Sequence, residues 1–160
     1  MRFLVCGEGN SDLGTSEEHP GPLMGAVRWC VGQVLEAAPG FSDSYRFSRK
    51  SDIQRALPPK GGKRMALRHT DEDKEVAVFR RQAQALATLA NQGADDGVIF
   101  FHDCDFTREK VSPTQREARH QAIVCAMERG FREANYKNGV PMVPRPRSES
   151  WFLCLCRRAE

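Results

Sequence analysis

The chain has 160 residues, with 24 Lys+Arg against 21 Asp+Glu and a formal net charge of +3. This length suits one compact domain, and 40% hydrophobic residues can form a core, which argues against wholesale disorder. The net charge is too small to indicate nucleic-acid binding by itself. No apolar run approaches the roughly 20 residues that cross a bilayer, and the N-terminal residues do not resemble a secretory signal. We therefore expect a cytoplasmic protein with no membrane contact.

Six cysteines are spread along the chain without a Cys-x-x-Cys pair. This spacing predicts neither a zinc ribbon nor a redox dithiol. Free cysteines are among the most buried residue types, so we expect most of them to be small core residues in a reducing compartment.

The first third of the chain predicts a strand, a helix and a weaker strand. Arg2–Cys6 is a short apolar run that ends at Gly-Glu-Gly, as expected of a buried strand. After a loop rich in Gly, Ser and Pro, apolar residues recur at helical spacing over residues 22–37. In residues 40–57, aromatic and polar residues alternate, which predicts a short edge strand followed by a helical turn near Ile53.

The middle of the chain predicts a long connection, a helix and the central strand. Residues 58–73 contain two Pro, two Gly and mixed charges, which is typical of a loop. Residues 75–91 combine good helix formers with regularly spaced apolar positions, and Gly93 is placed to stop the helix. The sequence GVIFFH at 97–102 is β-branched and aromatic throughout, which indicates a strand buried on both faces.

The last third predicts two further helices around a short strand. Ser112 and Pro113 supply an N-cap and a first helical residue for a helix that runs to about Asn135. The residues expected on its inward face are His120, Ile123, Val124, Met127 and Phe131. Residues 140–143 form a short predicted strand, and Ser148 can cap a final helix.

This alternation of strands and helices predicts an α/β fold, with a mostly parallel central sheet flanked by helices in a Rossmann-like arrangement. In such sheets, ligands bind beyond the carboxyl ends of the strands. Acidic residues occupy this position after two of the predicted strands: Glu8 follows the first, and Asp103 and Asp105 follow the central one. We expect the ends of these two strands to be neighbours, so that the three carboxylates converge. Because like charges repel at close range, they would then favour a hard divalent ion such as Mg²⁺.

Basic residues lie close to these positions in the sequence and are candidates for binding substrate phosphates. The alternative is that they form an ordinary solvated surface. The six candidates are Lys63 and Arg64 in the long connection, and Arg108, Lys110, Arg145 and Arg147 near the later strands.

Two histidines near these positions have alternative interpretations. His102, which precedes Asp103, either serves as a proton shuttle or an extra metal ligand, or is a residue at the sheet edge with one satisfied nitrogen, and we favour the sheet-edge interpretation. His120 is expected to be a packing residue on the inward face of its helix.

The order of these motifs resembles the Toprim domain of topoisomerases, primases, recombination proteins and nucleases of the overcoming-lysogenization-defect type. The resemblance is carried by Glu-Gly-Asn-Ser-Asp at 8–12, by Asp-Cys-Asp at 103–105 and by PRPRSESWFL at 144–153. The similarity is greatest to small stand-alone Toprim-like proteins of bacterial and phage-defence neighbourhoods. It implies a single domain over residues 1–160, with a loop-rich insertion at 40–73 because the two acidic motifs are far apart.

The resemblance also implies roles for individual residues. Glu8 would act in acid–base or metal-binding work, and Asp103 and Asp105 would hold Mg²⁺ or Mn²⁺. Asp12 would be a further metal ligand, and Glu149 another acid near the site. Since the chain ends soon after Trp151, we expect a partner protein or a second copy of the chain to complete the site.

These expectations lead to three hypotheses about function. The first is a metal-dependent phosphodiester hydrolase with Glu8, Asp103 and Asp105 as catalytic residues, acting as a nuclease on DNA or RNA in phage defence or repair. The second is a hydrolase of nucleotides or small phosphoesters. The third is a non-catalytic Toprim-like module that binds nucleic acid or protein.

Overall fold

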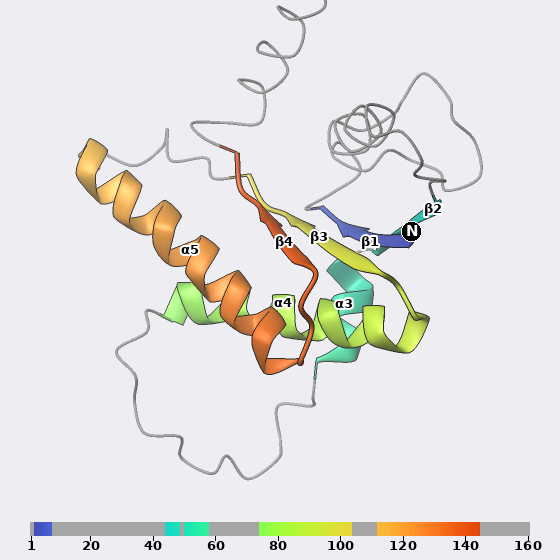
Figure 1. Cartoon of the computed structure of the whole chain (residues 1–160). Helices are drawn as coiled ribbons and strands as arrows, with labels where there is room; N and C mark the ends of the chain where they lie inside the picture. Colours follow the sequence, from blue (N-terminus) through green and yellow to red (C-terminus); the bar gives the residue numbers. More distant parts are fainter. Residues whose placement is uncertain (1, 8–43, 49, 58–73, 104–111, 145–160) are drawn as a thin grey trace, which may run out of the picture.

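The computed structural model describes residues 2–7, 44–48, 50–57, 74–103 and 112–144. They form four parallel strands in the order β2-β1-β3-β4 and three helices (Figure 1). The strands are β1 (Arg2–Cys6), β2 (Ser44–Ser48), β3 (Gly97–Phe101) and β4 (Gly139–Met142). The helices are α3 (Lys50–Ala56), α4 (Lys74–Gly93) and α5 (Pro113–Glu133). The predicted α/β class with a parallel sheet is confirmed.

All three helices lie on one face of the sheet (Figure 1). The connection from β2 to β3 passes over β1, and the connection from β3 to β4 continues in the same direction across the sheet. Because such crossovers are nearly always right-handed, both place their helices on the same face. None of the helices in the described part of the chain is long and apolar enough to span a membrane.

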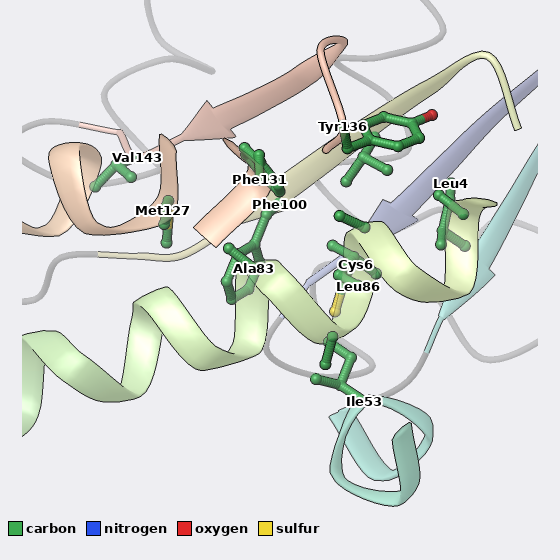
Figure 2. Close-up of a cluster of buried hydrophobic side chains, with 14 of the residues drawn as sticks. Leu4, Cys6, Ile53, Ala83, Leu86, Phe100, Met127, Phe131, Tyr136 and Val143 are labelled. Atoms are coloured by element: carbon green, nitrogen blue, oxygen red, sulfur yellow. The ribbon is translucent and has the colours of Figure 1, made fainter. Parts of the chain in front are cut away.

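The main core lies between this helical layer and the sheet. Leu4 and Cys6 are two residues apart in β1, so both lie on the face of the sheet that the helices cover. There they pack with Ile53 of α3 and Leu86 of α4 (Figure 2). From α5, the predicted inward residues Ile123, Met127 and Phe131 are buried, and Val124 packs against the same cluster. Burial of these side chains is the main force that holds the helices on the sheet.

The opposite face of the sheet carries a second apolar cluster. Val5 and Phe101 are almost completely buried, and Phe3, Phe47, Ile99 and Met142 pack against them. β3 therefore contributes apolar side chains to both faces, as predicted for the central strand.

Helix α5 begins with a complete capping box. The amide of Gln115 donates to Oγ of Ser112 at 3.2 Å, and the amide of Ser112 donates to Oε1 of Gln115 at 2.8 Å. Pro113 occupies the first turn, where its missing N–H costs nothing. The predicted cap is confirmed, and the helix ends at Glu133, two residues earlier than expected.

The short edge strand and the helical turn predicted within residues 40–57 are confirmed as β2 and α3, and β2 is a member of the main sheet. One detail of the fold differs from the sequence-based expectation. Gly93 ends α4, but the left-handed conformation belongs to Ala94, at φ 53°. Gly93 instead leaves room for Arg46, whose guanidinium would clash with any Cβ at that position. The predicted elements at 22–37 and after Ser148, and the connection at 58–73, lie outside the described residues.

Candidate functional site

The carboxyl ends of β1 and β3 lie side by side. The two strands pair in parallel, with Val5 opposite Ile99 and Cys6 opposite Phe100. Adjacent strands in a sheet are about 4.8 Å apart, so the residues that follow β1 and β3 leave the sheet from neighbouring positions. Gly7 follows β1, and His102 and Asp103 follow β3. The prediction that these two strand ends are neighbours is confirmed.

Of the predicted site residues, the structure describes Asp103, which is partly buried just beyond β3. The other predicted acids, Glu8, Asp12, Asp105 and Glu149, lie outside the described residues. The same holds for the six predicted phosphate-binding residues, namely Lys63, Arg64, Arg108, Lys110, Arg145 and Arg147.

The donor chemistry of the predicted acids fits a magnesium ion, because Mg²⁺ prefers oxygen ligands and all five candidates carry carboxylates. Asp103 is the member of this set whose place in the fold is described, at the carboxyl edge where the strands end. Within the described ranges, no three His, Cys, Asp or Glu side chains come together as a metal cluster.

His102 continues β3 toward this edge. Its amide donates to the carbonyl oxygen of Met142 at 3.1 Å, which extends the pairing of β3 with β4 by one step. Its ring contacts the ring of Phe79 on α4, with the two centroids 4.4 Å apart and the planes tilted by 47°. The side chain of His102 therefore lies on the helical face of the sheet, which agrees with its interpretation as a sheet-edge residue.

His120 of α5 has a more specific environment than the expected packing role. Its Nε2 lies 3.1 Å from the carbonyl oxygen of Val143, directly after β4. Because a carbonyl oxygen only accepts, Nε2 carries the proton in this hydrogen bond. The other ring nitrogen, Nδ1, is buried and has no hydrogen-bond partner within residues 2–7, 44–48, 50–57, 74–103 and 112–144.

Three buried side-chain atoms lack partners in the described part of the chain: Oγ of Ser48, Nε of Arg116 and Nδ1 of His120. All three lie toward the carboxyl edge of the sheet. Ser48 is the last residue of β2, paired with Cys6, and the other two lie on the N-terminal half of α5. Since buried polar groups are nearly always hydrogen-bonded in folded proteins, three such atoms without partners among the described residues distinguish this edge from the rest of the sheet.

At the amino edge, by contrast, the buried charge is fully paired. The side chain of Asp95 is completely buried and accepts hydrogen bonds from Nε of Arg2 at 2.7 Å and from Nε of Arg46 at 2.9 Å. Nη2 of Arg46 also donates to the carbonyl oxygen of Leu89 at 3.0 Å. This arrangement ties together β1, β2 and the end of α4, and we interpret it as structural.

Tyr136 closes the same amino-edge network. Its hydroxyl donates to the backbone oxygen of Asp95 at 2.7 Å. Burial raises the pKa of Tyr136 above its usual 10.0, and the nearby charges of Asp95 and Asp96 raise it further. The neutral phenol is therefore the form that the fold favours.

A surface pocket of about 530 Å³ lies at the C-terminal end of α5, where Arg132, Asn135 and Lys137 contribute to its lining. It opens near the amino ends of the strands, away from Asp103. We therefore assign the candidate functional site to the carboxyl edge and not to this pocket.

The partners of Asp95 and the buried atoms at the carboxyl edge that lack partners among the described residues were not predicted from the sequence. Arg46 and Arg2 are 49 and 93 residues away from Asp95, and no local pattern connects them. For His120 and Arg116, their i, i+4 spacing was the available signal. Comparison with protein families, with curated proteins and with solved structures found no match to this chain.

Proposed function

We propose that this protein is a metal-dependent phosphodiester hydrolase that acts as a nuclease on DNA or RNA. The observation that supports this most directly is the parallel pairing of β1 with β3. It makes neighbours of the two strands that precede Glu8 and Asp103 in the sequence. Ligand sites in parallel α/β sheets lie beyond such carboxyl ends. The Toprim resemblance of the motifs at 8–12 and 103–105 adds the expectation of phage defence or repair.

In this proposal, Mg²⁺ or Mn²⁺ is held by carboxylates of Glu8, Asp12, Asp103, Asp105 and Glu149. When bound, the ion would polarise a phosphate oxygen and offset charge on the leaving oxygen. The six basic residues named above would orient the substrate backbone by contacting its phosphates. Glu8, Asp103 and Asp105 are the catalytic residues of the proposal.

The test is incubation of the purified full chain with plasmid DNA, single-stranded DNA and single-stranded RNA, in Mg²⁺, in Mn²⁺ and in EDTA. We expect cleavage that requires the divalent ion and is lost in Asp103→Asn and Asp105→Asn. Asp96→Asn is the matched control, because Asp96 is an exposed acid at the opposite edge of the sheet. Circular dichroism checks that each variant is folded.

The alternatives give different results in the same assay. If the protein hydrolyses nucleotides but leaves polynucleotides intact, the site would be reassigned to small phosphoesters. Binding of nucleic acid without turnover, unchanged by Glu8→Ala, would indicate a non-catalytic module. Cleavage at the wild-type rate by both Asp variants would reject the proposed site.

A further inference from the structure

Two side chains one turn apart on α5 have buried nitrogens without partners among the described residues. Arg116 and His120 have the i, i+4 spacing that places side chains on the same face of a helix. Nε of Arg116 and Nδ1 of His120 are both buried, and neither has a hydrogen-bond partner in the part of the chain that the structure describes. An unpaired buried polar atom is costly, so two of them on one face indicate that something polar binds there.

The position of the His120 ring is set by the sheet. Its Nε2 donates to the carbonyl oxygen of Val143 at 3.1 Å, which orients the ring and leaves Nδ1 for another contact. Val143 directly follows Met142, whose carbonyl oxygen accepts from the amide of His102. The ring therefore stands over the end of β4, beside the end of β3 that leads to Asp103.

The chemistry of the two nitrogens selects the ligand. Nε of Arg116 is always a donor and carries a delocalised positive charge, so it needs an acceptor and disfavours a nearby cation. With Nε2 donating to Val143, Nδ1 of a neutral ring accepts, whereas Nδ1 of an imidazolium ring donates. A phosphate group can then bridge the two side chains, because one of its oxygens accepts from Nε of Arg116 and another from the N–H at Nδ1 of the imidazolium.

We propose that Arg116 and His120 form a subsite for a phosphate group, on the helical face of the carboxyl edge. The identification of this phosphate as part of the nucleic-acid backbone rests on the proposed function. The subsite places one phosphate beside the end of β3, so that the scissile bond lies near Asp103. Arg116 and His120 bind the substrate in this proposal and take no part in bond breaking.

The ring nitrogens of His120 give a direct readout that does not depend on catalysis. The full chain is labelled with ¹⁵N-histidine and kept in EDTA at fixed pH and ionic strength. Inorganic phosphate, a nucleoside monophosphate and a short single-stranded oligonucleotide are then added separately. We expect ligand binding to shift the Nδ1 signal of His120 while the Nε2 signal stays in place, and Arg116→Gln to lose this response. The spectrum of His120→Gln assigns the signals.

Paired variants separate binding from folding. His120→Gln retains an amide near the position of Nε2 but nothing at Nδ1, whereas His120→Asn does the reverse. We expect oligonucleotide affinity to fall ~10-fold in His120→Gln and in Arg116→Gln, as for loss of one charged hydrogen bond, and to fall less in His120→Asn. Arg132→Gln is the matched control on the same helix, at its opposite end, and should stay within about twofold.

The outcomes are distinguishable. A response to the oligonucleotide supports a backbone phosphate, and a response to the two small ligands alone supports a phosphate subsite for a small ligand. If none of the three ligands changes the His120 signals, the subsite is overturned. Water would then be the partner of both nitrogens. If nucleic acid is cleaved in a metal-dependent way but the His120 signals do not change with any ligand, the subsite is rejected and the proposed function stands. If the His120 signals change but no metal supports cleavage, the subsite stands and the proposed function is rejected.

Discussion

The buried carboxylate of Asp95 is held by the guanidinium of Arg46, which reaches it from the edge strand β2 across the end of α4. Arg46 binds both carboxylate oxygens and also the carbonyl oxygen of Leu89. One ion pair therefore connects the edge of the sheet to the helical layer.

Removing Arg46 should destabilise the fold more than removing the side chain of Arg2. Arg46→Met leaves a fully buried carboxylate with one remaining cation, and we expect the free energy of unfolding to fall by about 2–3 kcal/mol. Arg2→Met removes a single side-chain hydrogen bond and should cost about half as much. Urea unfolding of both variants measures the difference, and equal losses would contradict the dominant role of Arg46.

Tyr136 should make the fold sensitive to alkaline pH. Because its pKa is raised in the folded state, its contribution to stability is fully present below pH 10.0, where the unfolded phenol is also neutral. As pH rises through the folded pKa, that contribution is lost. Tyr136→Phe should lower the free energy of unfolding by about 1 kcal/mol at neutral pH, because it removes the hydrogen bond to Asp95.

The alkaline effect is measured as the difference between the two proteins. Urea unfolding at pH 8, 9, 10 and 11 should show a smaller alkaline loss in Tyr136→Phe than in the wild type. Tyr45→Phe removes the other tyrosine of the chain and serves as the control. Parallel pH profiles for the wild type and Tyr136→Phe would contradict the assignment.

Two Ser→Ala substitutions should have opposite effects on stability. Oγ of Ser48 is buried and has no hydrogen-bond partner among the described residues, so Ser48→Ala in ligand-free protein should be neutral or stabilising by up to ~1 kcal/mol. Ser112→Ala removes the N-cap of α5 and should cost about 1 kcal/mol. Thermal unfolding of the pair provides the comparison. A destabilising Ser48→Ala would show that the hydroxyl has a bound partner in solution.

The close packing of α4 against α5 should depend on Gly130. A Cβ added there would overlap the backbone oxygen of Arg80 and approach Cβ of Ala83 to 2.8 Å. Because the backbone oxygen cannot move aside cheaply, Gly130→Ala should lower the free energy of unfolding by about 2–3 kcal/mol. Ala118→Ser, at an exposed position of the same helix, should stay within about 0.5 kcal/mol. Chemical denaturation of both tests whether the helix contact is this tight.

Mg²⁺ or Mn²⁺ should stabilise the protein if the acids at the carboxyl edge bind it. A ligand that binds only the folded state raises the free energy of unfolding by about 2.7 kcal/mol at 100 times its Kd. We expect the melting temperature to rise with added Mn²⁺, to return to the starting value with EDTA, and to be unaffected by Mn²⁺ in Asp103→Asn. An equal rise in that variant would place the ion elsewhere.

Local sequence patterns were sufficient to predict the strands and helices that the structure describes. The apolar run of β1, the β-branched run of β3 and the Ser-Pro start of α5 each specify their structure through neighbours in sequence. The edge strand β2 and the helix after it were predicted from alternation within a few residues. These predictions succeeded because strand and helix periodicity are properties of short segments.

Other features were beyond reach of such patterns. Gly93 has the position of a helix stop. A Cβ at this position would also clash with the guanidinium of Arg46, which comes from strand β2. His120 matched a packing position, and its hydrogen bond to Val143 depends on where β4 lies under α5. Both roles involve partners more than 20 residues away.

The amino-acid sequence alone thus determined which of the described segments become strands and helices, and that acids follow the strands that end before residues 8 and 103. Tertiary structure alone decided that β1 lies between β2 and β3, that Asp95 pairs with two arginines, and that buried nitrogens without partners among the described residues lie at the carboxyl edge. The reason is that secondary structure follows from contacts within a few residues. Strand order and the pairing of buried charges follow from the burial of apolar surface across the whole chain.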